Sequence, residues 1–294
     1  MIPPEQLENI KYYLDKSESP LFFFDDDNDG LCSFILFRQF TGKGIGIPIK
    51  THPDLSEALL NRVIEHNPDY IFILDKPVVS QDFLDQVNVP VIWLDHHSIV
   101  KRNNVKYYNP KLNDPDERSS TTYWAYKAVG GKLWIATVGA VSDWTIPDFF
   151  EEFRKEYPDL AGDKKTPPEL LYDTKLGRLC KIFSFLNKGK VSIVKKNLRD
   201  VLKIESPYDI LDKKTKEGKY IVEQTAKIEK EYDGILNKAL KTKPHAKQII
   251  FTYSSRDLSL TSDLSNELLY KNKDKIIIVG REKDGELRMS LRSD

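Results

Sequence analysis

The sequence predicts an α/β protein built around a parallel sheet, followed by a smaller α/β part joined through helices. Two observations predict this fold. Short apolar runs alternate with helix-length segments, and three of these runs end directly in an aspartate. Short buried runs separated by helices are typical of βαβ units, whose parallel strands are covered on both faces. Because the carboxyl ends of parallel strands meet at one edge, we expect the three aspartates to gather there.

The first half, up to about residue 145, follows this alternation element by element. We expect strands over 21–24, 44–49, 70–74 and 91–94, and helices over 31–40, 55–65 and 81–87. The stretch 147–168 is rich in Pro and charged residues, so we expect an excursion over the surface.

The second half changes character. Apolar residues recur at helical spacing over 176–186 and again over 221–239, which predicts connecting helices. Near the end we expect strands at 248–253, 276–279 and 286–291, with a helix over 258–270. These elements predict the small second α/β part.

The composition limits the classes of function. Lys+Arg and Asp+Glu number 45 each among 294 residues, so nucleic-acid affinity must come from local patches rather than from a global basic field. The two cysteines, Cys32 and Cys180, lie far apart in apolar surroundings, which favours a reduced cytosolic protein. The chain shows no export signal and no membrane span, so we expect a cytoplasmic location without a membrane partner.

An acidic cluster follows the first apolar run, in FFFDDDNDG. Asp25, Asp27 and Asp29 occupy alternate positions, which share one face of an extended chain. Clustered carboxylates repel one another unless a cation neutralises them, and oxygen-rich sites suit Mg, Ca or Mn. A solvated acidic loop is the simplest alternative. The pattern also matches an EF-hand loop, but Leu36 stands where that loop needs Glu.

Further candidate ligands follow later apolar runs. Asp75 ends IFIL, the triplet Asp95, His96 and His97 follows VIWL, and Asp143 follows a small apolar segment. Singly, Asp75 and Asp143 are compatible with helix caps or surface acids. Taken with the acidic cluster, they supply enough ligands for two metals that share one carboxylate and leave positions open for water and phosphate. The added histidines favour Mn or another first-row ion.

The motifs DDDNDG, IFILD, LDHH and GAVSD occur in this order within residues 20–145. Together they closely resemble the DHH phosphoesterase superfamily, and the first motif resembles its branch of RecJ and related archaeal nucleases. The position at which other members carry a His is Phe23 here, and Asp25 would take over that ligand role.

The resemblance implies a role for each site residue. Asp25 and Asp27 would hold one metal, and Asp75 would bridge to the second. The second metal would be held by Asp29, His96 and Asp143. Two further residues would assist: His97 would face the scissile phosphate, and Asp95 would orient its neighbour. The implied cofactors are two Mn²⁺ ions, with Mg²⁺ or Co²⁺ as alternatives.

The carboxyl-terminal IIIVGREKDGELRMSLRS resembles the start of a DHHA1 domain, which grips the substrate strand in this superfamily. Ser290, Arg292 and Ser293 match its S-x-R-S element, in which Arg would pair with a phosphate. The alternative for Arg292 is a surface arginine. The family's GGGH loop should follow, but the sequence ends at Asp294. We therefore expect a DHH catalytic domain over 1–190, connecting helices over 191–243 and an incomplete DHHA1-like domain over 244–294.

Two more segments are candidates for substrate contacts. Arg118, Ser119 and Ser120 precede an expected helix, where amide groups and Arg would hold a phosphate, although a plain N-cap is an equal alternative. Residues 175–203 hold nine Lys or Arg against one acid. Such a run is either a solvated helix face or a surface that follows a phosphate backbone.

These features predict a Mn-dependent phosphodiesterase. The leading hypothesis is an exonuclease specific for single-stranded DNA or RNA, acting in DNA repair or replication. A nanoRNase or cyclic-dinucleotide phosphodiesterase is the alternative enzyme, and an inactive replication scaffold is the alternative outside enzymes. The candidate partners are single-stranded nucleic acid, a helicase or other replication or repair protein, and a second copy in a homodimer.

Overall fold

The computed structural model describes residues 1–49, 54–255 and 258–293. The chain divides into two compact units, residues 1–184 with 202–207 and residues 185–201 with 208–294. The three-part division into catalytic, connecting and DHHA1-like segments remains a prediction. Within the described ranges, every helix is too short or too polar to cross a membrane.

The first unit is built on a parallel sheet, as predicted, but the sheet has five strands instead of the four expected. Its strands run in the order β2-β1-β4-β6-β7. Their bounds are β1 Leu21–Asp25, β2 Ile45–Ile49, β4 Ile71–Leu74, β6 Val91–Leu94 and β7 Lys106–Tyr108. A two-stranded sheet pairs β3 Asp54–Leu55 with β5 Val78–Val79. Because β1 and β4 are direct neighbours, their carboxyl ends lie beside each other.

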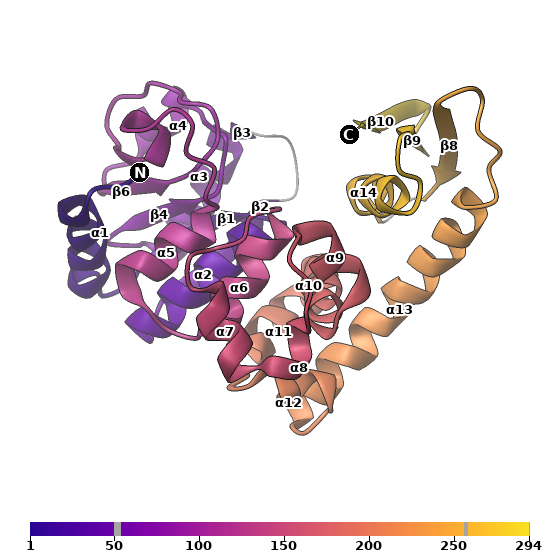
Figure 1. Cartoon of the computed structure of the whole chain (residues 1–294). Helices are drawn as coiled ribbons and strands as arrows, with labels where there is room; N and C mark the ends of the chain where they lie inside the picture. Colours follow the sequence, from indigo (N-terminus) through magenta and orange to yellow (C-terminus); the bar gives the residue numbers. More distant parts are fainter. Residues whose placement is uncertain (50–53, 256–257, 294) are drawn as a thin grey trace. The chain divides into compact units, whose positions relative to one another are not determined.

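The central strands are apolar on both faces because both faces are covered. On one face, Phe24 stacks on Phe34 of helix α2 (Asn28–Thr41), with ring centroids 4.7 Å apart. On the other face, Phe23 meets Phe83 of helix α4 (Gln81–Gln86) edge to face. Figure 1 shows α2, α5 and α6 on one side of this sheet and α3 and α4 on the other. Successive side chains of a strand point to opposite faces of the sheet, and both faces here are covered by helices. Each central strand is therefore buried in the interior of the unit.

The remaining helices of the first unit surround this sheet. Their bounds are α1 Pro4–Lys16, α3 Leu60–His66, α5 Thr121–Val129, α6 Leu133–Ser142, α7 Phe150–Glu156, α8 Pro158–Ala161 and α9 Pro167–Asp173. Helix α10, Lys175–Leu186, begins in this unit and ends in the second.

Two expectations about these elements were wrong. The helix expected over 55–65 is divided into strand β3, a 3₁₀ turn at Glu57–Leu59 and the shorter α3. The surface excursion expected over 147–168 contains α7 and α8. Phe150 and Phe153, spaced three residues apart, bury one face of α7, and this packing outweighs the turn-forming Pro residues around it.

The second unit contains a three-stranded sheet in the order β10-β9-β8. Strand β8 (Gln248–Ser254) is parallel to β9 (Ile276–Lys283), and β10 (Glu286–Arg292) is antiparallel to β9. The helices are α11 Val191–Val201, α12 Pro207–Leu211, α13 Lys216–Ala239 and α14 Thr261–Lys271. Helix α14 starts three residues later than expected, with Leu260 at the position before its first residue.

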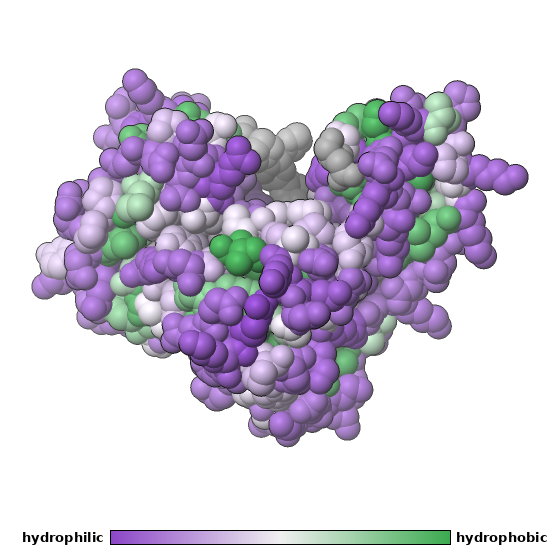
Figure 2. Space-filling model, viewed as in Figure 1, coloured by the Kyte–Doolittle hydropathy of each residue, from purple (hydrophilic) through white to green (hydrophobic). Residues whose placement is uncertain are grey.

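The core of the second unit joins its two long helices to the sheet. Tyr232 and Leu236 of α13 cluster with Leu264 of α14 and with Ile249 and Ile277 of the sheet. The face of the protein drawn in Figure 2 is mostly hydrophilic, and its apolar patches are small and separate. This agrees with the burial of the large apolar side chains.

Candidate metal centre

The loop from β1 to α2 places three aspartates in a confined space. Asp25 ends β1, Asp27 is the N-cap of α2, and Asp29 lies in the first turn of that helix. The Asp27 carboxylate accepts a hydrogen bond of 3.0 Å from the Gly30 N–H. A Cβ at Gly30 would lie 2.4 Å from the Asp25 carbonyl oxygen, so the tight loop requires glycine at this position.

Asp29 is held by the start of helix α5. Its side chain is buried, and its two carboxylate oxygens accept the backbone N–H groups of Thr121, at 2.8 Å, and Thr122, at 2.7 Å. The Thr121 hydroxyl also donates to Oδ1 of Asp75, at 3.0 Å. The first turn of α5 therefore orients two candidate ligands at once. Sequence reasoning missed Thr121 and Thr122, although both directly follow the predicted cap residue Ser120.

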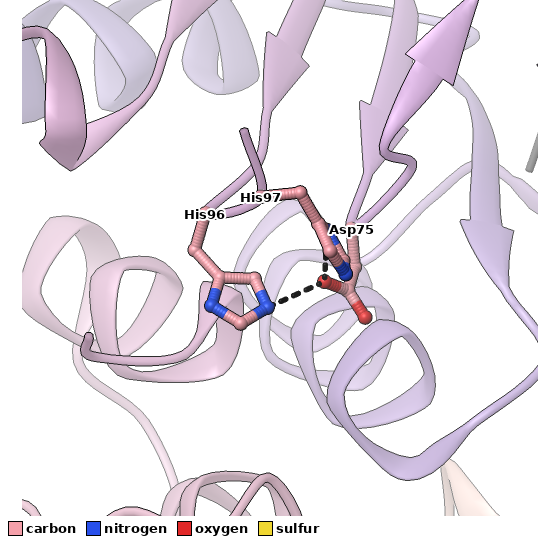
Figure 3. Close-up of side chains that lie close together, drawn as sticks. All are labelled: Asp75, His96 and His97. Atoms are coloured by element: carbon pink, nitrogen blue, oxygen red, sulfur yellow. Dashed lines mark ion pairs between the residues drawn. The ribbon is translucent and has the colours of Figure 1, made fainter. Parts of the chain in front are cut away.

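Asp75 follows β4 in a left-handed conformation, with φ at 59°. Aspartate adopts this conformation more readily than bulky residues do, and here the Asp75 N–H is fixed to the Leu94 carbonyl at 2.9 Å. The buried carboxylate faces both histidines. Its Oδ1 lies 3.4 Å from Nε2 of His96 and 3.8 Å from Nδ1 of His97 (Figure 3). Asp75 thus lies close to both histidine rings.

Asp95 forms a buried anchor for His97. Its Oδ1 lies 2.7 Å from Nδ1 of His97, and its Oδ2 accepts from the His97 N–H at 3.1 Å. Asn109 and Tyr107 also donate to Oδ2, at 3.2 and 3.3 Å. With Nδ1 held by Asp95, the Nε2 atom of His97 is the ring nitrogen left for a ligand or substrate.

Asp143 approaches His96 from the opposite side to Asp75. It caps the C-terminus of α6, and its Oδ2 lies 3.7 Å from Nδ1 of His96. The Nε2 atom of the same ring lies 3.7 Å from Oδ2 of Asp29. The cap interpretation and the ligand interpretation of Asp143 are therefore compatible.

The structure brings the predicted ligands together in three groups whose ligand atoms lie within 4.8 Å of one another. They are Asp25 with Asp27 and Asp75, Asp29 with His96 and Asp143, and Asp75 with His96 and His97. The first two match the two halves predicted from the sequence, although the roles of the residues remain proposals. Among the described residues, Asp95 belongs to none of these groups, and its orienting role remains a proposal.

The electrostatics of the cluster call for a cation. Partial desolvation by the surrounding protein atoms, together with the charges of Asp25 and Asp29, raises the pKa of the exposed Asp27 to about 7. Burial and the neighbouring aspartates raise the pKa of Asp143 to about 9 and that of Asp75 well above its ordinary value. Oxygen donors beside imidazoles fit Mn²⁺, Mg²⁺ or a similar divalent ion, which would let all the carboxylates ionise together.

The two histidines differ in their surroundings. Burial lowers the pKa of His96 despite the opposing charge of Asp29, which favours the neutral ring that a metal requires. Burial would also lower the pKa of His97, but its hydrogen bond to Asp95 and the charge of that carboxylate outweigh burial and raise it. His97 is therefore the more basic ring.

Lys76 is a site residue that sequence reasoning missed. It follows Asp75 directly, its side chain is 2% exposed, and its Nζ lies 2.5 Å from Oδ1 of Asp25. Lysine is almost never buried unless it is paired. A lysine in a chain with 45 basic residues gives no such signal, so its place in the site emerges only in three dimensions.

Comparison with solved structures identifies the fold. RecJ of Thermus thermophilus, solved with Mn²⁺, matches all of this chain with a TM-score of 0.65 and 14% identity. The chain spans 48% of that protein's length. An exonuclease RecJ bound to manganese matches all of the chain and 83% of its own length, with a TM-score of 0.61 and 15% identity. This protein has the DHH/RecJ-like fold.

A further structure supports the same fold. The DHH domain of a protein described as a member of a ribosomal-protein family covers 95% of this chain and 74% of its own, with a TM-score of 0.60 and 12% identity. A scan against family models and a search of curated proteins found no match. The DHH/RecJ-like fold, expected from the four motifs, is thus confirmed by the structural comparison.

Within this DHH/RecJ-like fold, the predicted phosphate contacts before α5 have partners of their own. Ser120 is the N-cap of α5, and its hydroxyl accepts from the Tyr123 N–H at 3.2 Å. The Ser119 hydroxyl donates to Glu117 at 2.7 Å, and the Arg118 N–H donates to the same carboxylate. The geometry favours the cap interpretation for Ser120, and phosphate binding by Arg118 and Ser119 remains a prediction.

The predicted S-x-R-S element lies at the end of β10. The Ser290 hydroxyl lies 2.9 Å from that of Ser265. Arg292 donates to Asn266 at 2.7 Å and to the Ser262 hydroxyl at 3.1 Å, and Ser293 is exposed. The guanidinium is therefore positioned by α14, and its role toward phosphate remains a prediction.

The basic run 175–203 covers α10, α11 and the residues that follow each helix, and several of its cations pair with acids. Lys175 pairs with Asp159 at 2.8 Å, Lys188 with Asp263 at 3.3 Å, and Lys196 with Asp200. Phe183 and Phe185 within the run are buried, so neither is exposed for stacking on a base. A phosphate-binding role for the run remains a prediction.

Proposed function

We propose that this chain is a metal-dependent phosphodiesterase that trims single-stranded DNA or RNA from an end during DNA repair or replication. The observation that supports the proposal most directly is the pair of ligand groups, Asp25–Asp27–Asp75 and Asp29–His96–Asp143, at the carboxyl edge of one parallel sheet. The fold shared with RecJ agrees with it.

The ligand chemistry suits two Mn²⁺ ions, with Mg²⁺ or Co²⁺ as alternatives. Bound divalent ions would supply a nucleophilic water and neutralise charge on a phosphate. Within this proposal Asp75, which belongs to two of the three ligand groups, is the carboxylate shared between the ions. Thr121 holds the Asp75 carboxylate in place through its hydroxyl.

His97 would act on the substrate rather than on metal. Asp95 fixes its ring through Nδ1 and raises its pKa, so Nε2 is able to carry a proton. A protonated Nε2 donates to a phosphate oxygen and stabilises the negative charge that develops there. His97 is 41% exposed at its side chain, so a substrate can reach the ring.

The proposed context follows from this activity. The substrate is single-stranded nucleic acid, the location is the cytoplasm, and the candidate protein partners are a helicase or another replication or repair protein and a second copy of the chain.

The test is digestion of DNA and RNA strands labelled separately at each end, with Mn²⁺, with Mg²⁺ and with a chelator. We expect metal-dependent shortening from one end by the wild type. Asp75→Asn should lose more than about 100-fold in rate, because it removes the proposed shared ligand. Asp116→Asn, at an exposed acid outside the site, should keep wild-type activity.

Other outcomes would replace the proposal. Turnover confined to di- to pentanucleotides would make the chain a nanoRNase, and turnover confined to cyclic dinucleotides a cyclic-dinucleotide phosphodiesterase. Absence of any cleavage, together with absence of metal by elemental analysis, would indicate a scaffold.

A further inference from the structure

Lys76 places a positive charge inside one half of the centre. Strands β1 and β4 are parallel neighbours, with Phe24 opposite Leu74, so the residues that follow them lie side by side. Asp25 ends one strand, and Asp75 and Lys76 follow the other. The ammonium of Lys76 reaches across to Oδ1 of Asp25 at 2.5 Å, while its side chain is 2% exposed.

A buried ammonium is costly unless an anion compensates it. Here the compensating anion is a proposed metal ligand. A divalent ion held by Asp25 would stand beside the ammonium on the same carboxylate. Two positive charges this close repel each other, and the burial of the Lys76 side chain limits how well water can screen its charge. The ammonium and the ion therefore compete for one carboxylate.

The Asp29–His96–Asp143 half of the centre has no such buried ammonium among the described residues. Within the described ranges, the ion pairs of Asp29 and Asp143 are made with His96, a ring that a metal can bind in its neutral form. Lys111 acts on Asp143 and His96 only through its charge at a distance. In the part of the chain that the structure describes, no ammonium is paired with the Asp29 or Asp143 carboxylate of this half.

We propose that Lys76 is a built-in cation that occupies the Asp25–Asp27–Asp75 half, so that the centre takes up divalent ions in order. The Asp29–His96–Asp143 half fills first, and the other half fills only when an ion displaces the ammonium from Asp25. This inference rests on the proposed metal-dependent function. No covalent step is involved, because the ammonium leaves Asp25 as an intact cation.

The test is a Mn²⁺ titration of the full chain, followed by calorimetry and by electron paramagnetic resonance, which distinguishes single ions from coupled pairs. We expect the wild type to bind one ion tightly and a second at least about tenfold more weakly. Lys76→Met removes the charge and keeps a side chain of similar length. The affinity for the second ion should therefore rise by about tenfold or more. Coupled pairs should then form from the first additions. Lys76→Arg should keep the order.

Lys111→Met is the matched control. It removes one positive charge near the Asp29–His96–Asp143 half. The affinity for the first ion should therefore rise, and the difference in affinity between the first and second ions should become larger. Thermal unfolding checks that Lys76→Met folds. Without the ammonium the three aspartates repel, so the variant should unfold earlier than wild type in chelator and regain stability with Mn²⁺.

Two results would overturn the inference. One is equal affinity for both ions in the wild type, and the other is a difference in affinity between the two ions that stays the same in Lys76→Met. These are distinct from failure of the function. If the ions bind in order but no strand is cleaved, the proposed activity is wrong and the inference stands. If strands are cleaved while two ions bind with equal affinity, the inference is wrong and the activity stands.

Discussion

Nδ1 of His97 lies 2.7 Å from Oδ1 of Asp95, and the Asp95 carboxylate is completely buried. Asn109 and Tyr107 hold the other oxygen of this carboxylate. The pair therefore resembles the carboxylate-histidine arrangements that fix the tautomer and orientation of a reactive ring. Because the contact raises the pKa of His97, its loss has a measurable consequence.

Asp95→Asn should lower the pKa of His97, since it removes the charge and the acceptor that outweigh the effect of burial. We expect the rate of phosphodiester cleavage to fall about 10- to 100-fold. A pH titration of the His97 ring by NMR, in the metal-free protein, measures the shift directly. An Asp95→Asn variant with an unchanged His97 pKa would contradict the assignment of this pair.

The metal-free protein should lose stability as pH rises. The pKa of Asp27 is raised to about 7 and that of Asp143 to about 9, whereas an aspartate in the unfolded chain titrates near 4. The folded state therefore holds extra protons between these values, and its stability is greatest below about pH 4 for these groups and falls through pH 7 and 9. Thermal unfolding in chelator should show a midpoint that drops by several degrees.

Mn²⁺ should reverse this trend, because ion binding is favoured by the ionised carboxylates and strengthens as pH rises. Asp143→Asn, which cannot ionise, should flatten the upper part of the metal-free profile. A metal-free midpoint that rises steadily from pH 6 to 9 would show that these carboxylates are not the groups in control.

Asn28 ties the acidic loop to the end of α6. Its amide donates to the Ser142 hydroxyl at 2.7 Å and to the Cys180 carbonyl at 2.9 Å. Asn28→Ala removes both hydrogen bonds, and it should lower the free energy of unfolding by about 1–3 kcal/mol in urea denaturation. Gln86→Ala removes an exposed amide that donates to the Asp82 carbonyl, and it should cost less than about 0.5 kcal/mol. Equal costs for the two variants would be evidence against a structural role for Asn28.

Gly30→Ala should damage the centre through the backbone. Its Cβ would lie 2.4 Å from the Asp25 carbonyl oxygen, so β1 and α2 would have to separate. We expect a loss of about 1–3 kcal/mol or more in the free energy of unfolding, together with weaker Mn²⁺ binding.

Gly234→Ala is the matched control for this variant. Gly234 lies within α13, and a Cβ there meets nothing within 4 Å. Since alanine is the better helix former, this change should stabilise the protein by about 0.5–1 kcal/mol. If Gly30→Ala were equally well tolerated, the tight loop would not depend on glycine.

The local pattern of the sequence was sufficient to predict the sheet and the acids at its edge. Apolar runs such as IFIL and VIWL predicted buried parallel strands, and Asp75 and Asp95 were expected to meet because parallel strands end at one edge. The same reasoning failed over 55–65 and 147–168. Over 147–168, the packing of Phe150 and Phe153, which bury one face of a helix, outweighs the turn-forming composition.

The sequence by itself determined which side chains reach the carboxyl edge of the sheet, since that follows from strand periodicity and strand direction. Only the tertiary structure decided their partners. The amides of Thr121 and Thr122 hold Asp29, which is nearly a hundred residues away in the sequence. The ammonium of Lys76 holds Asp25, which is about fifty residues away. Periodicity along a chain fixes the direction of a side chain, but contacts between distant segments, and the pKa shifts that burial causes, arise only when those segments pack together.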